Sequence, residues 1–456
     1  MTVFETDDHH QLRETVRAFA AHEIAPRVAS MESAQAVDVE TSALIARQGW
    51  IGVTIPREYG GMGAGHLAKT IVIEELARVS GAMGAMVQAS QLGAAKILHF
   101  GTERQKRRWL PPIAAGECLP TIAVTEEGSG GNVLDMQASA HRDGDEWVLN
   151  GRKLYVGNSH VGHVHGVVVR TGPPEGRSRS LSAFLVEHDR PGVRLVPYEP
   201  CLGLHGFSFG DLVMRDVRVP TANMIGAEGE GLDVAYSSSV LYGRPNLTAV
   251  ALGIHQALLD ETVAFAAQRD RRGEPLAKLA TVGQRIGQIK QRLMTARALA
   301  YQAVAMLDLG QPCDDELISA KYRGVESLWE SALAAMKIHA AAGLRRDRPI
   351  ERLVRDAFHM DAPAGTGDIQ LRRLAESALG TGKGQWSVRL AHVTALRPPS
   401  PHPPPHESPP HDRVVGTIPA MTTPCSLTCG AAPGTVIRPP SPGPHRAPFP
   451  SSKPVP

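Results

Sequence analysis

The hydrophobic periodicity of the chain changes twice, and these changes limit the folds that are open to it. From about residue 8 to residue 118, apolar side chains recur at the spacing of amphipathic helices. Short β-branched and alternating runs follow, and the Asn150-Gly151 dipeptide between two of them predicts a hairpin. Helical periodicity returns near residue 230, in segments of the length of bundle helices. We therefore predict an α+β protein with an N-terminal α-helical domain (1–118), a middle antiparallel β domain (119–229) and a C-terminal helical bundle (230–385).

The end of the chain differs in composition from the rest. Residues 398–456 contain 19 of the 35 prolines and show almost no apolar periodicity. Such a segment buries too little apolar surface to offset the entropy of ordering the chain. We predict that residues 386–456 form a disordered Pro-rich tail with local polyproline II structure. Two roles stay open for it, a solvated extension and a ligand for a proline-binding domain.

Charge and sequence patterning argue against several partners and locations. The 48 basic and 46 acidic residues give a net charge of +2, whereas a nucleic-acid-binding protein is usually far more basic. The N-terminus is acidic from the start, so we expect no signal peptide, and no run of about 18 apolar residues predicts a membrane span. Five scattered cysteines form no disulfide framework, which favours a reducing compartment. We expect a cytoplasmic protein without nucleic-acid or membrane partners.

Several short motifs occur in an order and spacing that point to one family. The loop Val124–Gly131 reads VTEEGSGG, and the run that starts at Asn150 reads NGRKLYVGNS. The segment 216–220 reads DVRVP, Arg355 begins an RDA triplet, and a Gly-Thr pair follows at Gly365. Together these motifs resemble the signatures of the acyl-CoA dehydrogenase family.

The resemblance covers residues 5 to about 380 and implies a fold, a cofactor and a reaction. The fold has a helical domain, a central antiparallel β-barrel and a C-terminal four-helix bundle, and the subunits form a homotetramer or a homodimer. FAD lies in the cleft between the β domain and the bundle. The family removes the α-proton of an acyl-CoA or acyl-carrier-protein thioester while the β-carbon gives a hydride to FAD. A flavoprotein or oxygen then accepts the electrons.

The motifs also imply which residues meet FAD. Glycines in the loop 124–131 let the backbone approach a ring system or a pyrophosphate closely, Thr125 offers a hydroxyl group, and Tyr155 offers an aromatic face. The residues expected at the cofactor are Ile122, Val124, Thr125, Gly130, Gly131, Tyr155, Val156, Gly157, Arg269, Arg272, Lys337, Thr366 and Asp368.

Some of these positions depart from the usual contacts of the family. Gly157 stands where the family has a threonine, although its backbone amide could still donate a hydrogen bond. Arg272 and Lys337 add positive charge where the FAD phosphates of a neighbouring subunit would lie. The positions expected to bind the substrate are Gly131, Tyr242 and Arg244.

The clearest departure concerns the catalytic base. In most of the family the base is a Glu directly before Gly-Thr, and here that residue is Ala364. In relatives whose base has moved, it precedes the arginine that matches Arg244, and here that residue is Gly243. Neither side chain ionises, and the loss of a positioned base costs roughly 10²–10⁴ in rate. The weak candidates for another base are Asp361, His359 and Tyr242.

Three interpretations of the function remain open. The first is an FAD-dependent dehydrogenase of an acyl thioester with a non-standard or absent base. The second is a flavin-dependent oxygenase or oxidase on the same fold, and the third is a non-catalytic binding homologue. A metal site is not expected, because His160, His163 and His165 have metal-like spacing but no acidic residue or cysteine beside them.

Overall fold

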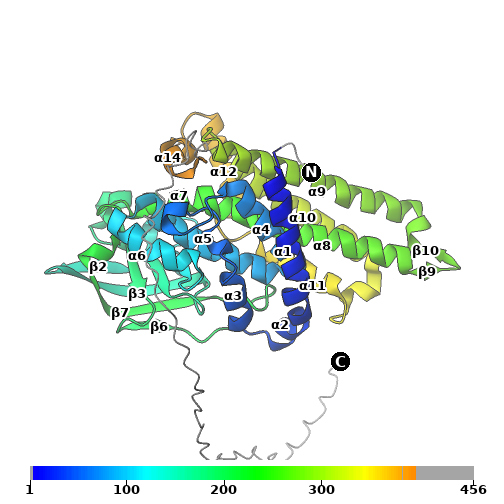
Figure 1. Ribbon diagram of the computed structural model, residues 1–456, viewed down its shortest axis with the longest axis horizontal. Coiled ribbons are helices and arrows are strands. Elements are labelled where there is room, and N and C mark those ends of the chain that lie inside the picture. The colour runs from blue at the N-terminus through cyan, green and yellow to red at the C-terminus, as the bar shows by residue number, and fades with distance from the viewer. Residues whose placement is uncertain (1–3, 383, 397–456) are drawn as a thin grey trace, which may run out of the picture. The chain divides into compact units, whose positions relative to one another are not determined.

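The N-terminal part of the chain is helical (Figure 1). The structure, a computed structural model, describes residues 4–382 and 384–396. Side-chain caps explain several helix starts: Asp38 accepts a hydrogen bond from the Thr41 amide, and Ser80 and Thr102 cap the helices that follow them. The helices are α1 (Asp7–Phe19), α2 (Val28–Ala34), α3 (Val39–Ala46), α4 (Gly65–Val79), α5 (Gly81–Phe100) and α6 (Glu103–Ala114).

Eight strands follow and form one mixed sheet. The strand order is β6-β7-β3-β2-β4-β5-β8, with β1 beside β4, and β4 pairs in parallel with both β1 and β2. The expectation of an antiparallel domain is wrong for these two pairs and right for the others. The expected closed barrel is not confirmed, because β6 and β8 lie at the ends of the order of the described strands. The strands are β1 (Pro120–Ala123), β2 (Ser139–Asp143), β3 (Glu146–Gly157), β4 (Val164–Arg170), β5 (Leu181–Glu187), β6 (Val193–Leu195), β7 (Phe209–Pro220) and β8 (Met224–Ile225).

Asn150 and Gly151 lie inside the long strand β3, so the hairpin turn predicted there is wrong. The turn that joins β2 to β3 is at Gly144, where φ is +65°. The register between β3 and β7 shifts next to Gly151, and Asn150 accepts a hydrogen bond of 2.9 Å from the Asp216 amide. A Cβ at Gly151 would lie 2.4 Å from the Cβ of Ala138. The dipeptide therefore does not form a turn. It lies at a β-bulge, and the glycine lets the chain at Ala138 approach closely.

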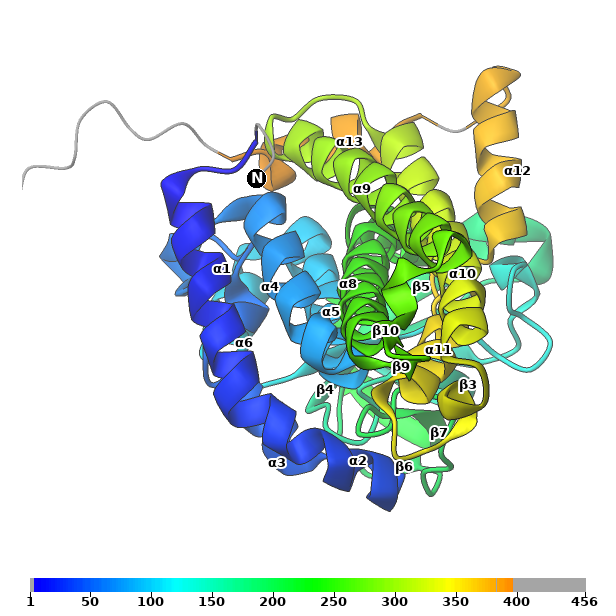
Figure 2. The same cartoon turned by 90° about the vertical axis from the view of Figure 1, so that its right-hand side faces the viewer.

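Long helices form the C-terminal part. Helices α8, α9 and α10 pack against one another, and α11 packs against α8 and α10 (Figure 2). A π-helical turn, Ser239–Gly243, joins α7 to α8, and a short hairpin of β9 (Asp270–Arg271) and β10 (Glu274–Pro275) joins α8 to α9. No helix in the described ranges combines the length and the hydropathy of a membrane span. The helices are α7 (Gly231–Ser238), α8 (Arg244–Gln268), α9 (Ala280–Asp308), α10 (Asp314–His339), α11 (Pro349–His359) and α12 (Gly367–Ala378).

Two short helices, α13 (Trp386–Arg389) and α14 (Ala391–Thr394), occupy residues that were expected to belong to the tail. Trp386 and Leu390 are buried, and the Trp386 amide donates a hydrogen bond of 2.7 Å to Asp314. The predicted start of the disordered tail at residue 386 is therefore wrong, because the apolar residues here pack against the folded part. The rest of the predicted tail, residues 397–456, lies outside the described residues.

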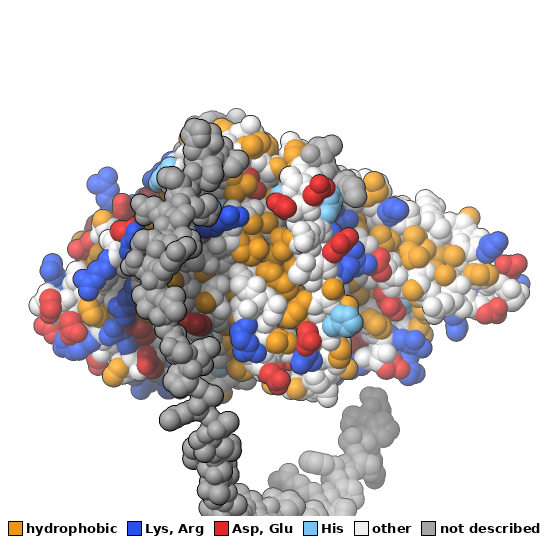
Figure 3. Space-filling view, in the orientation of Figure 1, with side chains coloured by type: hydrophobic (Ala, Val, Ile, Leu, Met, Phe, Trp, Pro, Cys, Tyr) orange, Lys and Arg blue, Asp and Glu red, His pale blue; other side chains and the backbone are white. Residues whose placement is uncertain are grey.

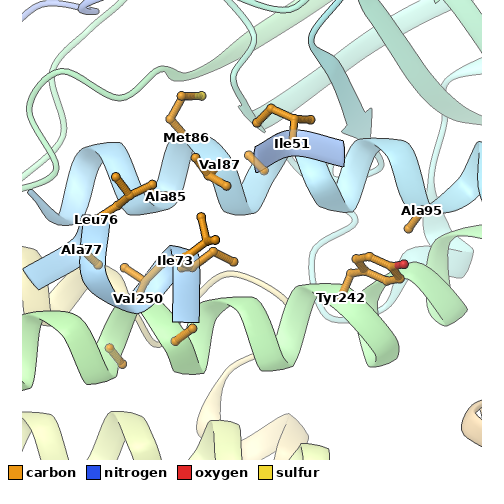
Figure 4. Packing of buried hydrophobic residues seen from close by; sticks show 14 of the residues in the cluster. Ile51, Ile73, Leu76, Ala77, Ala85, Met86, Val87, Ala95, Tyr242 and Val250 are labelled. Atoms are coloured by element: carbon orange, nitrogen blue, oxygen red, sulfur yellow. The ribbon is translucent and has the colours of Figure 1, made fainter. Parts of the chain in front are cut away.

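One hydrophobic core joins the N-terminal helices to the C-terminal helices. Figure 4 shows side chains of α4, α5 and α8 packed together with Tyr242 of the π-helical turn. Glycine lets α8 approach α4 closely, because a Cβ at Gly253 would lie 2.4 Å from the carbonyl oxygen of Glu74. The sheet has a smaller core of its own, which includes Trp147 and Phe184. Residues of the sheet, among them Val168 of β4 and Leu185 of β5, also belong to the core of the helices, so the helical parts and the sheet are packed as one body.

Candidate active site

A cavity of about 630 Å³ lies where the sheet meets the helices. Helix α5, the loop after β1 and the end of β3 form part of its wall. Residues 204–209, the turn between α7 and α8, and the segment between α11 and α12 form the rest. The wall is mainly apolar and holds a few polar side chains, which is the usual composition of a small-molecule site.

Three residues of the cavity wall have a strained backbone. Tyr155, Leu204 and Ala364 have φ angles of +56°, +57° and +56°, in the left-handed region that residues with a side chain rarely occupy. Leu204 is held there by Asp356, whose carboxylate accepts a hydrogen bond of 2.6 Å from the Leu204 amide. Strain of this kind collects at functional sites because the surrounding fold must maintain it.

The loop after β1 is fixed from behind by a buried ion pair. The Glu126 carboxylate lies 2.6 Å from the Lys153 ammonium group and also accepts hydrogen bonds from the Gln137 and Ala138 amides. Burial lowers the pKa of Lys153 to about 8. Because Glu126 points away from the cavity to this pair, it stiffens the loop that presents Thr125, and an acid-base role for it is not supported.

Aromatic rings form one wall of the cavity. The rings of Tyr155 and Phe209 stack with their centroids 5.6 Å apart, and Phe207 stacks on Phe209 at 6.2 Å. A Cβ at Gly157 would lie 3.1 Å from Ala89 Cβ and 3.2 Å from the Phe207 ring, so a larger residue there would crowd both. Tyr155 is 59% exposed, so its ring face is open to a ligand.

Arg244 is a buried cation at the cavity wall, only 3% exposed. Its guanidinium group donates hydrogen bonds to neutral oxygens, to Gln370 Oε1 at 2.7 Å and to Ser239 Oγ at 3.4 Å. Burial lowers the pKa of Arg244 to about 10, so the group stays charged at neutral pH. No carboxylate of the described residues lies within ion-pair distance of it, and this absence is unusual for a buried charge.

The two family positions of the base lie side by side. A Cβ at Gly243 would lie 3.2 Å from the Cβ of Ala364, so a side chain at residue 243 would touch Ala364, which lines the cavity. Among the described residues that line the cavity there is no Asp or Glu, and His359 is the one histidine. Burial lowers the pKa of His359 to about 4, so its imidazole is neutral at physiological pH and can accept a proton.

The other two candidate bases do not line the cavity. The Asp361 carboxylate accepts a hydrogen bond of 2.8 Å from the Gly367 amide, at the start of α12. The Tyr242 hydroxyl donates to Thr54 at 3.2 Å inside the core, and burial raises the pKa of Tyr242. Tyr242 was also expected at the substrate, and the structure keeps it away from the cavity.

The segment that carries Ala364 is held from the bundle side by two polar residues. The buried ammonium group of Lys321 donates to the carbonyl oxygens of Asp361 and Gly365 at 2.5 and 2.8 Å. The Gln370 amide donates to the Ala364 carbonyl at 3.1 Å while its oxygen accepts from Arg244. The position of Ala364 and the orientation of the guanidinium group are therefore coupled through one side chain.

The structure brings most of the residues expected at FAD together. Val156 and Asp368 are neighbours of wall residues but do not line the cavity themselves. Arg269, Arg272 and Lys337 are exposed and lie at the far end of the bundle, since the 25 residues of α8 span about 37 Å between Arg244 and Arg269. The expected residues in the wall are Ile122, Val124, Thr125, Gly130, Gly131, Tyr155, Gly157 and Thr366, together with Arg244 from the substrate set.

The residues predicted from the sequence do not include the aromatic pair Phe207 and Phe209, nor Tyr236, Ser239 and Gln370. The pair stands one residue apart in a glycine-flanked loop, GFSFG, and this spacing places both rings on one side of an extended chain. That pattern was a usable signal. Gln370 gave none, because its role depends on the contact between α12 and Arg244.

The cavity has the features that a flavin dinucleotide needs. Apolar and aromatic walls suit a planar ring, and the hydroxyl groups of Thr125 and Thr366 lie in the wall. The backbone amides of Gly130 and Gly131 donate to no other described residue, and nothing lies within 4 Å of a Cβ built at Gly130. Close backbone approach and free amides are what a phosphate or a ring edge requires.

Metal ligation has no counterpart in the described part of the chain, where no group of three or more His, Cys, Asp or Glu side chains could hold an ion. The three histidines with metal-like spacing have other contacts. His160 bonds the Val196 carbonyl, His163 accepts from the Leu119 amide, and His165 bonds the Thr121 hydroxyl.

Comparison with known families gives three matches along the chain. The models are described as acyl-CoA dehydrogenase, N-terminal domain (residues 6–117), middle domain (residues 121–217) and C-terminal domain (residues 229–379). An acyl-CoA dehydrogenase of Bacillus subtilis (strain 168) is 32% identical over 376 residues, which cover 82% of this chain and 99% of the relative.

Solved structures share the fold. Butyryl-CoA dehydrogenase from Megasphaera elsdenii superposes with a TM-score of 0.81 at 28% identity and covers 83% of this chain and all of its own. The prolyl acyl carrier protein oxidase AnaB superposes with a TM-score of 0.76 at 26% identity and covers 82% of this chain and 99% of its own. Structures with FAD and with FADH2 share the fold at 24% and 22% identity.

Proposed function

Since the chain belongs to the acyl-CoA dehydrogenase family, whose members are flavin oxidoreductases that act on CH-CH groups, we propose that it binds FAD in the cavity and dehydrogenates the acyl part of a thioester. The carrier is CoA or an acyl-carrier protein. The observation that carries the proposal is the apolar cavity between sheet and bundle, bordered by the glycine loop, Tyr155, Thr366 and Arg244.

Residues of the wall would hold the cofactor. The Gly130 and Gly131 amides and the Thr125 and Thr366 hydroxyl groups suit its polar atoms, and Tyr155 suits a ring face. FAD bound there supplies the acceptor for the hydride that leaves the β-carbon. The apolar walls exclude water, and the strained backbone at Ala364 and Leu204 holds the substrate side of the cavity in one shape.

His359 is our proposal for the proton acceptor. It lines the cavity, its imidazole is neutral above a pH of about 4, and its ring lies against Phe209 at 5.0 Å. A base with such a low pKa is weak, which predicts slow α-proton removal compared with an imidazole of ordinary pKa in the same place.

A second function has one specific observation in its favour. Because no Asp or Glu lines the described cavity, the site also suits an oxidase or oxygenase that needs no carboxylate for the α-proton. An acyl-carrier-protein oxidase occurs among the structures of the same fold. The electron acceptor would then be oxygen and not a flavoprotein.

We further propose that the protein acts in the cytoplasm and that its subunits form a homotetramer or a homodimer. Phe358 and Leu333 are 46% and 57% exposed on α11 and α10, and Figure 3 shows apolar side chains gathered over the middle of one face. Arg269, Arg272 and Lys337 lie away from the cavity, so any contact of theirs with FAD would cross a subunit interface. Light scattering measures the assembly state directly.

The visible spectrum of the purified protein tests the proposal. We expect flavin absorption that bleaches anaerobically when an acyl thioester is added. Bound flavin that does not bleach, but consumes oxygen once it is reduced in the presence of a thioester, would support the oxidase or oxygenase. Protein that stays colourless after incubation with excess FAD would contradict both and support a binding homologue.

A further inference from the structure

The cavity beside Ala364 and Arg244 is lined by no Asp or Glu of the described residues. A Cβ at Gly243 would lie 3.2 Å from Ala364 Cβ and 3.6 Å from Ser239 Oγ. Ser239 Oγ in turn accepts a hydrogen bond from Arg244. The cation therefore borders the same space, with only one hydroxyl group between it and the position of a side chain at residue 243.

Arg244 has no anionic partner to offset its burial. Its two hydrogen-bond acceptors, Gln370 and Ser239, are neutral. Asp314 acts on Arg244 electrostatically, but its carboxylate is held by the Trp386 and Ser387 amides at 2.7 and 2.9 Å. The other cation nearby, Arg373, pairs with Glu376 and adds repulsion.

A buried guanidinium group is normally paired with a carboxylate, often through two parallel hydrogen bonds. Arg244 lies between two cavities. The smaller one also contains Asp314 and Glu376 in its wall, but the carboxylates of both are bound to other groups. No residue in the wall of the larger cavity provides a carboxylate, and that cavity is large enough for a ligand. The missing anion is therefore supplied from outside the chain. A carboxylate suits the group best, because the fork of the guanidinium N–H groups matches its two oxygens.

We infer that the acyl group bound in this cavity carries a carboxylate of its own, which pairs with Arg244 in the part of the cavity beside Ala364. The substrate class is thus a monothioester of a short dicarboxylic acid. This inference rests on the proposed function, because it names the substrate of the same site.

Binding to the FAD-loaded protein tests the inference, measured anaerobically by isothermal titration calorimetry. The probes are succinyl-CoA and glutaryl-CoA, and their neutral counterparts of equal carbon number are butyryl-CoA and valeryl-CoA. We expect each dicarboxylic thioester to bind at least about tenfold more tightly than its counterpart. Equal or tighter binding of the neutral thioesters would overturn the inference and leave the proposed function intact. A preparation that takes up no FAD would instead defeat the proposed function.

Variants at two positions show whether Arg244 binds the carboxylate of the acyl group. In Arg244→Gln the ratio of the two affinities should fall to about one, and Arg244→Lys should keep part of the preference. Ala364→Glu places a fixed carboxylate in the proposed space, so it should weaken glutaryl-CoA binding at least about tenfold more than the neutral control Ala364→Gln does. The comparison of the two Ala364 variants still tests the inference if Arg244→Gln does not fold. Equal effects of the two Ala364 variants would contradict the inference.

Free glutarate shows whether the anion belongs to an acyl chain. We expect it to bind far more weakly than glutaryl-CoA, because it lacks the contacts of the thioester and its carrier. Equal affinity of free glutarate and glutaryl-CoA would mean that the site holds a free anion, and the assignment to an acyl thioester would be wrong.

Discussion

The Glu126 carboxylate and the Lys153 ammonium group meet at 2.6 Å behind the loop that lines the cavity. Lys153 has no exposed side-chain surface, and Glu126 is 9% exposed. Removal of one partner would leave the other charge buried and unpaired. The pair therefore ties the local fold to the geometry of the site.

Lys153→Met should lower the free energy of unfolding by about 3–5 kcal/mol, because the Glu126 charge would remain buried without its partner. Denaturation by urea, followed by circular dichroism, measures the change. The double variant with Glu126→Gln should recover part of the loss, since it removes the second charge. A loss below about 1 kcal/mol for Lys153→Met alone would show that the carboxylate relaxes into water.

His359→Gln should slow anaerobic flavin bleaching by an acyl thioester by roughly 10²–10⁴, the usual contribution of a general base. Stopped-flow absorbance measures the rate. In the unsubstituted protein the rate should rise as the pH increases through about 4 and stay level above, because imidazole accepts a proton only when neutral. His188→Gln is the control, since that exposed residue does not line the cavity. A rate unaffected by His359→Gln would rule this residue out as the base.

Single residues in the site were predictable where a motif carried them. Thr125, Tyr155 and Thr366 lie in the wall as expected. The pairing of Gln370 with Arg244 and of Lys321 with the carbonyls of the loop after α11 depends on distant segments. No local sequence pattern marks such contacts, because each joins residues at least 40 positions apart in the chain.

Helix α4 begins without a side-chain cap of its own, and the last residue of α9 takes over that task. The Asp308 carboxylate accepts hydrogen bonds from the His66 and Leu67 amides at 2.6 and 2.9 Å. Two elements far apart in sequence are thereby joined by the polar groups at their ends.

Asp308→Ala should destabilise the protein by about 1–3 kcal/mol, since two buried amides at the start of α4 lose their acceptor. Burial raises the pKa of Asp308 to about 6 from 3.8, so the folded protein binds its proton more tightly than the unfolded chain does. The free energy of unfolding of the unsubstituted protein, compared with that of Asp308→Asn, should therefore fall as the pH rises from about 4 to 6. Above pH 6 the difference between the two proteins should change little. Thermal unfolding at several pH values measures both effects, and an advantage that grows over this range would contradict the assignment.

For the helices and strands, it was easier to predict the type of each element than the way in which the elements pair and connect. A helical segment, a strand-rich segment and a second helical segment follow one another in the predicted order. The Asn150-Gly151 turn did not form, because Asn150 bonds across to Asp216 and Gly151 meets Ala138 closely. A strong local preference for a turn was overridden by tertiary contacts, and the parallel pairs of β4 likewise need information from distant strands.

For the molecule as a whole, the contribution of residues 386–396 to the fold is a measurable quantity. Trp386 and Leu390 are buried, the Trp386 and Ser387 amides bond Asp314, and the Leu396 amide bonds the Asp308 carbonyl. Composition alone placed the start of the tail too early, because a single Trp and Leu near a Pro-rich stretch do not show helical periodicity. Trp386 contacts Asp314 of α10, and the sequence around Trp386 does not indicate this distant partner.

A chain that ends at residue 396 should unfold at the same temperature as the full chain, whereas one that ends at residue 382 should lose about 3–5 kcal/mol, the usual effect of deleting a buried Trp. Differential scanning calorimetry compares the two. The shorter chain also removes the partners of the Asp314 carboxylate. Equal stability of both truncations would show that α13 and α14 do not contribute to the fold.

The close crossing of α4 and α8 has a consequence for how such proteins can be recombined. Three family segments run along the chain, yet the first and the third meet across Gly253, where even a methyl group would collide with the Glu74 carbonyl. A chimera that borrows the N-terminal helices of a relative must therefore import the matching face of α8 as well. The two helical segments are therefore inherited together, and the face of the sheet that packs on them, which includes Val168 and Leu185, must match them as well.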